Sequence, residues 1–179
     1  WQFTWERYVF IGVTSTLLAL PLLLREALAA EHDAWEKLRA EHLAAVRAAF
    51  SSVAPGQRIL LFCHDPTALP FLAEIPEVAA RFTQIETTVI GHLHSELLLR
   101  KSRLLAGLPP IRWLGVSVAR MSTALHRAKI WRRFHVRLCP SLTGIQLLKD
   151  GGWLTAELSS NSSEPARFTF HPLRWSSVP

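Results

Sequence analysis

The sequence predicts an α/β fold, and the prediction depends on three neighbouring stretches. Residues 59–62, Ile-Leu-Leu-Phe, are a short apolar run, and residues 87–90, Thr-Thr-Val-Ile, are a second short run. Each is bounded by polar or glycine residues, which is typical of buried strands. Between them, residues 67–82 have apolar side chains at helical spacing, with Thr67 able to cap a helix and Pro76 expected to interrupt it. A strand, a crossover helix and a strand of these lengths predict a parallel βαβ unit.

Each of the two predicted strands is followed by a turn that carries histidine. Cys-His-Asp-Pro occupies residues 63–66, and Gly-His-Leu-His occupies residues 91–94. The C-terminal ends of parallel strands meet at one edge of a sheet, where open α/β folds bind their ligands. Imidazole suits Zn, Mn, Fe and Cu, so the pattern predicts a metal site shared by His64, His92 and His94. The alternative is that they are three polar loop residues that happen to follow strands.

These two turns, in this order, resemble the last two motifs of the calcineurin-like metallophosphoesterases. The resemblance covers about residues 8–158 and implies an α/β chain that is the C-terminal part of a four-layer αββα sandwich. Residues 1–158 would be this portion of the domain, and residues 159–179 a tail. The resemblance also implies two divalent transition-metal ions (Mn, Fe or Zn), with His64 and His92 binding one ion and His94 the other.

Three earlier motifs of that family, Asp-x-His, Gly-Asp-x-x-Asp and Gly-Asn-His, do not occur in this sequence. The implied activity is hydrolysis of a phosphoester by metal-activated hydroxide. Without a carboxylate to bridge two metals, we expect the chain alone to be inactive. It would then need a missing N-terminal portion of the same domain, or it has lost the catalytic half. Asp65 could accept the other ring N–H of His64 and so orient that imidazole, or it could be a turn residue before Pro66.

A basic stretch suggests a different class of function. Residues 97–149 include eleven lysines or arginines and no acidic residue, in a chain of net charge +6. Such a stretch could attract phosphate-bearing substrates, or it could be a solvated face. In the alternative to an enzyme, residues 97–137 form a non-catalytic module that binds nucleic acid or an anionic membrane. In that case Trp113, Trp131 and Phe134 could stack on bases.

The remaining segments predict further elements and a cellular compartment. Residues 8–24 are uncharged, but this run is short for a membrane span and contains Pro21, so a strand over residues 8–13 followed by a helix is preferred. No obligate membrane span is therefore expected. Cys63 and Cys139 are expected to be buried free thiols, which favours a reducing, cytoplasmic location.

Three secondary-structure predictions and one prediction of exposure complete the analysis. Residues 21–51 predict one long helix, and residues 97–105 a short amphipathic helix ended by Gly107. Residues 144–148 and 153–158 predict a hairpin, and residues from 159 onward a mobile tail. A half-domain would leave one sheet face uncovered, and the positions expected on that face are Ile11, Val13, Leu61 and Val89.

Overall fold

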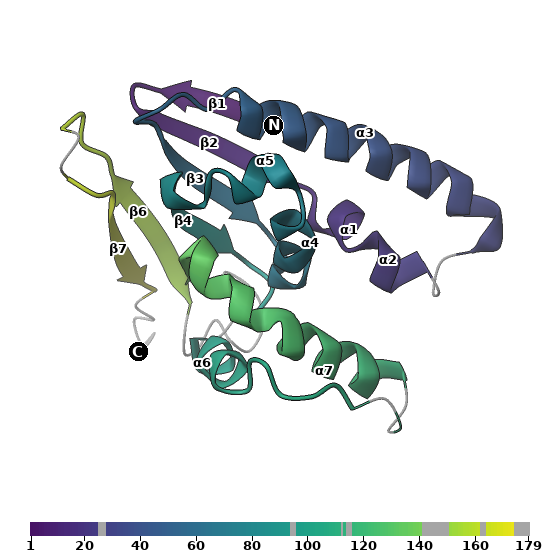
Figure 1. The fold of residues 1–179 in the computed structure, drawn as a ribbon. Coiled ribbons are helices and arrows are strands. Elements are labelled where there is room, and N and C mark those ends of the chain that lie inside the picture. Colours follow the sequence, from purple (N-terminus) through teal and green to yellow (C-terminus); the bar gives the residue numbers. More distant parts are fainter. Residues whose placement is uncertain are drawn as a thin grey trace, which may run out of the picture.

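The computed structural model describes residues 1–24, 28–93, 96–111, 113, 116–140, 151–161 and 164–173. These residues form a mixed α/β fold around a five-stranded sheet (Figure 1). The strands stand side by side in the order of the sequence: β1 (Gln2–Trp5), β2 (Tyr8–Val13), β3 (Arg58–Cys63), β4 (Ile85–Ile90) and β5 (Val136–Leu138). The predicted α/β class is confirmed at this level, as is the strand over residues 8–13.

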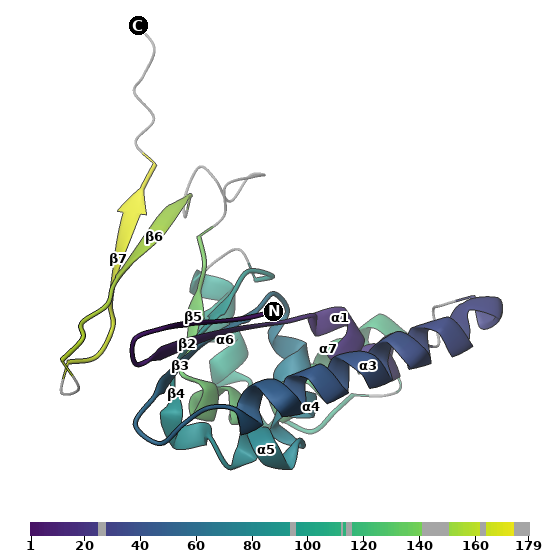
Figure 2. The same ribbon diagram turned by 90° about the horizontal axis from the view of Figure 1, so that it is seen from above.

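The sheet is parallel apart from its first strand, because β1 pairs with β2 in the antiparallel sense. Each crossover moves one strand further in the same direction, and right-handed crossovers then place every helix on the same face. Figures 1 and 2 show the helices gathered on that face. They are α1 (Ser15–Leu18), α2 (Leu20–Leu23), η2 (Ala29–Glu31), α3 (His32–Ser51), η3 (Pro66–Ala68), α4 (Leu69–Ala73), α5 (Pro76–Ala79), η4 (Phe82–Gln84), α6 (Glu96–Leu104), α7 (Val116–Arg127) and η5 (Ala128–Phe134).

The predicted βαβ unit is present, since β3 and β4 are parallel neighbours. Its crossover is not one helix but four short pieces, and Pro76 begins the third of them. The cap is also different from the prediction. Asp65, not Thr67, caps the first piece, because the Asp65 carboxylate accepts the Thr67 backbone N–H at 2.8 Å.

The long helix predicted over residues 21–51 is shorter in the structure. α3 begins only at His32 and ends at Ser51. Leu28, inside the predicted helix, has an extended backbone with φ −65° and ψ 132°. An unbroken helix over the predicted range would be roughly 45 Å long, while a six-residue strand spans about 20 Å. A single returning helix of that length would overshoot the start of β3. The chain instead passes through α1, α2 and η2 before it returns along α3.

One row of side chains crosses the sheet beneath the helices. Ile11, Leu61, Thr88 and Val136 lie opposite one another on β2 to β5, and all are buried. The prediction that Ile11, Val13 and Leu61 are exposed is therefore wrong, because these positions face the helices. Strand side chains alternate between the two faces, so the uncovered face carries the neighbouring positions instead.

The face opposite the helices is aromatic on its β1–β3 side. Phe10 and Phe62 stack there with ring centroids 6.4 Å apart, and Phe3 packs beside Phe10 at 5.6 Å. Trp1 packs against Phe62 at 5.5 Å and lies over Gly12, where a Cβ atom would come within 2.1 Å of the indole. Trp1 and Phe3 are 71% and 58% exposed, so this part of the sheet is largely open to solvent.

A two-stranded hairpin lies on the same side of the sheet as these aromatic residues (Figures 1 and 2). It consists of β6 (Gly152–Glu157) and β7 (Arg167–Pro172), paired in the antiparallel sense. The mobile tail predicted from residue 159 onward is thus wrong for β7, while the predicted strand at residues 144–148 lies outside the described residues. The hairpin is tied to the sheet because Arg7 donates to the Ser159 carbonyl at 3.0 Å and Glu86 accepts the Ala166 N–H.

The two cysteines are free thiols, as predicted, but only Cys63 is buried. Burial, together with the smaller effect of the nearby Asp65 charge, raises the pKa of the Cys63 thiol to about 12. Cys139 follows the edge strand β5 and is exposed, because no further strand among the described residues covers that edge.

Among the described residues, no helix combines the length and the apolar character needed to cross a bilayer.

His42 joins α3 to the end of β2, and this contact predicts a pH effect on stability. Its Nε2 atom accepts the Thr14 N–H at 3.1 Å, and burial together with the Trp1 α-amino group lowers the His42 pKa. As the pH falls through about 6.5, the unfolded chain takes up the proton first, so stability present above this pH is lost below it. Urea unfolding between pH 7.5 and 5 should show this loss. The loss should shrink in His42→Gln and persist in His126→Gln, and an equal loss in both variants would contradict it.

Candidate functional site

The two histidine turns predicted from the sequence lie side by side at the C-terminal edge of the sheet. His64 follows directly on β3, and His92 lies two residues beyond the end of β4. The His64 carbonyl accepts both the Gly91 N–H at 3.0 Å and the His92 N–H at 2.9 Å. The two turns are therefore fixed to each other by backbone hydrogen bonds that continue beyond the strand pair.

The imidazole rings of His64 and His92 are close and nearly perpendicular. Their centroids are 5.5 Å apart and their planes make an angle of 82°. Gly91 allows this approach, because a Cβ atom there would lie 2.8 Å from Nδ1 of His64. Any larger residue at position 91 would push the His64 ring away from its place between the turns.

The spacing of the two rings fits two ligands of one ion. Metal–imidazole bonds are about 2.0–2.1 Å long, so two rings that bind one ion through their edges have centroids roughly 5–6 Å apart. Both histidines are exposed, and among the described residues neither ring has a hydrogen-bond partner that would occupy its nitrogens. The donor atoms of both rings are thus available to a metal ion.

The third predicted ligand cannot be placed, because His94 lies outside the described residues. Within the residues that are described, no three His, Cys, Asp or Glu side chains gather closely enough to hold an ion. The structure brings together His64 and His92, the two predicted ligands that lie within the described residues.

Asp65 has a local partner in the turn after β3. Its carboxylate accepts the Thr67 N–H, and its carbonyl accepts the Cys63 thiol at 3.3 Å. These contacts are those of an Asx turn that starts η3. Of the two roles considered for Asp65, the described contacts are those of a turn residue, and they include no bond to His64.

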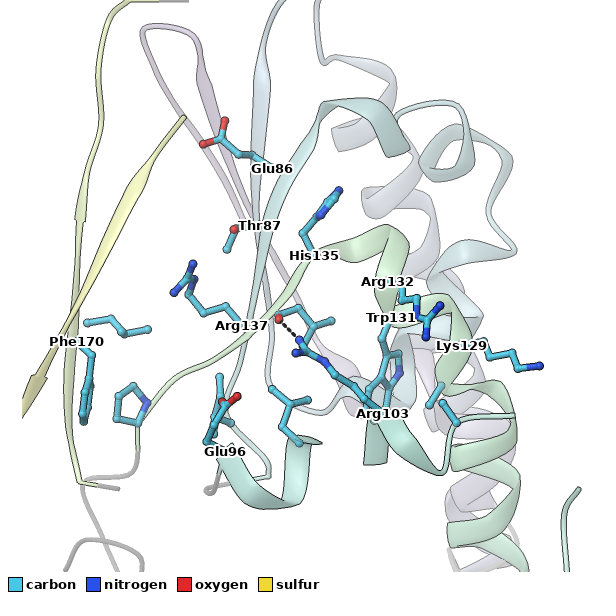
Figure 3. Close-up of a pocket in the computed structure, with 17 residues that line it drawn as sticks. Glu86, Thr87, Glu96, Arg103, Lys129, Trp131, Arg132, His135, Arg137 and Phe170 are labelled. Atoms are coloured by element: carbon cyan, nitrogen blue, oxygen red, sulfur yellow. Dashed lines mark hydrogen bonds between the residues drawn. The ribbon is translucent and has the colours of Figure 1, made fainter. Parts of the chain in front are cut away.

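A cavity among the described residues lies elsewhere, along the outer edge of β5 (Figure 3). Its volume is about 1080 Å³, and it is an open pocket lined by residues of α6, η5, β4, β5 and the β6–β7 hairpin. Sequence reasoning drew attention to the basic stretch that contributes to it but did not foresee a cavity. The walls come from segments far apart in the sequence, so only the charge of residues 97–137 could have hinted at it.

Two of the three aromatic residues expected to stack on bases are in the core. Trp131 and Phe134 are 4% and 0% exposed, because η5 packs its apolar side against the sheet and α4. The stacking prediction is wrong for both of them. Trp113 is 82% exposed and is the one of the three that a ligand in solvent could reach.

Comparison of the chain with protein-family models, with curated proteins and with solved structures found no match.

Proposed function

We propose that this chain is part of a metal-dependent phosphoester hydrolase of the calcineurin-like type. In this proposal His64 and His92 bind one metal ion and His94 a second, the ions being Mn, Fe or Zn. The observation that carries it is the pair of adjacent imidazoles at the C-terminal edge of a parallel strand pair, with centroids 5.5 Å apart and with no competing hydrogen bonds within the described residues.

The chemistry follows from what a two-metal site supplies. Two bound ions would lower the pKa of a coordinated water and so supply hydroxide for hydrolysis of the phosphoester. The part played by this chain is to hold ligands in place: the His64 carbonyl binds both the Gly91 and His92 N–H groups, and the absent side chain of Gly91 leaves room for the His64 ring. Carboxylate ligands for such a site would come from an N-terminal portion of the same domain, which is the partner that this proposal implies.

The proposal also covers the architecture of the complete domain. Helices cover one face of the sheet, while Trp1, Phe3, Phe10 and Phe62 present an aromatic surface on the other. A second sheet packed on that surface would complete a four-layer αββα sandwich, of which residues 1–158 are the C-terminal portion. The free thiols of Cys63 and Cys139 favour a reducing compartment such as the cytoplasm.

The binding of cobalt(II) to the purified chain tests the metal site, because its visible absorption reports nitrogen ligands directly. We expect His64→Ala and His92→Ala each to weaken binding at least tenfold, since loss of even an outer-shell partner typically costs about 10–100-fold in metal affinity. His126→Ala is the matched control, because His126 is exposed and its Nδ1 atom already contacts the Leu108 carbonyl at 3.1 Å.

Two outcomes would overturn the metal proposal: wild-type chain that takes up no cobalt, or all three variants that bind it equally well.

The competing function, a nucleic-acid or anionic-membrane module built on residues 97–137, makes a different prediction. Binding to oligonucleotides or anionic vesicles would then fall steeply with salt, and would not change with EDTA or with His92→Ala.

A further inference from the structure

We propose that the pocket along β5 binds the polyphosphate group of a nucleotide-sized organic phosphate. Neither His64 nor His92 lines this pocket, so the inference does not rest on the proposed metal site. The volume of about 1080 Å³ is slightly above the ~300–1,000 Å³ typical of small-molecule sites.

The charges around the pocket are unbalanced in favour of an anion. Arg103, Lys129, Arg132 and Arg137 line it, and no carboxylate of the described residues lies within ion-pair distance of these four cations. The two acidic residues of the lining have other partners. Glu86 pairs with Arg58 at 4.0 Å and also accepts the Ala166 N–H, and Glu96 pairs with Arg100 at 3.4 Å.

Two of the four cations are held in place with most of their donors unused. Arg103 donates from Nη2 to the Val136 carbonyl at 2.6 Å, and the Arg137 guanidinium lies 4.7 Å from the centre of the Phe168 ring. Figure 3 shows Arg103 against β5 from the side of α6 and Arg137 reaching toward the hairpin. The planar fork of arginine matches phosphate oxygens, and a guanidinium that is already ordered loses little freedom on binding.

Trp131 provides a second, independent indication of a ligand. It lines the pocket and is 4% exposed, yet within the described part of the chain its buried Nε1–H has no acceptor. Buried N–H groups nearly always have a partner, because leaving one unpaired is costly. A ligand oxygen in the pocket would supply the missing acceptor.

The opposite wall suits the organic part of such a ligand. Phe170 and Leu154 project from the hairpin, with Pro140 nearby. The Phe170 ring rests on the β6 backbone, since a Cβ atom at Gly152 would come within 2.6 Å of it, and it is still 47% exposed. An exposed, positioned ring beside a cationic site is suited to stack on a nucleobase or another planar group.

Calorimetric titration of the whole chain with tripolyphosphate and with ATP, both in EDTA, tests the proposal. We expect Arg103→Gln and Arg137→Gln each to weaken binding of both compounds about tenfold, because charge-assisted hydrogen bonds are lost. Arg47→Gln removes the same charge from an exposed position on α3, remote from the pocket lining, and should change the affinity less than about twofold.

Two more variants separate the parts of the ligand. Trp131→Phe removes the Nε1–H donor and should weaken tripolyphosphate binding several-fold. Phe170→Ala should weaken ATP binding several-fold but leave tripolyphosphate binding unchanged. His64→Ala should bind both compounds as the wild type does, so failure of the metal site and failure of this pocket are distinguishable.

Three results would overturn the inference. They are no measurable binding of tripolyphosphate at millimolar concentration, equal losses in Arg47→Gln and Arg137→Gln, and a thymidine decamer that binds through the same arginines more tightly than ATP. The last would replace a small ligand by nucleic acid. Circular dichroism identifies variants that fail to fold. If Arg103→Gln is one of them, Arg137→Gln decides, because its exposed guanidinium touches only the Phe168 ring in the described contacts.

Discussion

Replacing Phe134 with alanine is expected to lower the free energy of unfolding by about 3–5 kcal/mol, the usual cost of removing a fully buried aromatic ring. Phe134 is 0% exposed at the end of η5, and its ring meets the Phe82 ring edge-on with centroids 5.2 Å apart. η5 connects the last helices to β5 and packs against both β4 and α4. The substitution would therefore leave an empty space where η5, at the end of the connection from β4 to β5, packs against β4 and α4.

Urea denaturation followed by circular dichroism measures this loss. Leu104→Ala provides the control, because Leu104 is an apolar residue that is 84% exposed and its truncation should cost less than about 0.5 kcal/mol. A loss below about 1 kcal/mol for Phe134→Ala would show that η5 does not pack on the sheet as described.

The central strands could be predicted from the sequence because their signal is local. The strand-forming runs in β3 and β4 are each followed by a turn that carries histidine, and the intervening segment has the length of a crossover. Their parallel pairing then follows from general rules of chain connection. The same reasoning placed His64 and His92 at one edge of the sheet, and the structure brings their rings to 5.5 Å.

The two faces of the sheet could not be distinguished from the sequence, because β2 and β3 are apolar on both sides. Leu61 faces the helices and Phe62 faces away, although both side chains are apolar. Which face the helices cover depends on the handedness and direction of every crossover. The choice among Ile11, Val13, Leu61 and Val89 as exposed positions failed for that reason, and only Val89 lies on the uncovered face.

The sequence of β7 has the pattern of a strand, but the segment before it favoured the prediction of a mobile tail. Phe168 and Phe170 alternate with polar residues, which is typical of a half-buried strand, but a serine-rich segment precedes them.

No local sequence pattern predicts the pocket. Thr87, Arg103, Arg137 and Phe170 come from four separate elements, and their proximity is a property of the fold alone.

Thr88→Val is expected to stabilise the chain by about 1–2 kcal/mol, an unusual direction for a core substitution. Thr88 is 0% exposed in the row that contains Leu61 and Val136, and its Oγ1 atom has no hydrogen-bond partner among the described residues. A hydroxyl buried without a partner loses its bonds to water and gains none in return. Valine keeps the branched shape that suits a strand and replaces the hydroxyl by a methyl group of similar size.

Thr87→Val is the matched control for this gain, because it makes the same change one residue earlier on the same strand. Thr87 lies on the opposite face and lines the pocket, so its hydroxyl can meet solvent there, and the stability should change by less than about 0.5 kcal/mol. Urea denaturation of both variants at pH 7.5 gives the comparison. A Thr88→Val chain less stable than the wild type would mean that the Thr88 hydroxyl is bonded in solution, and that the row beneath the helices contains a polar contact rather than a purely apolar one.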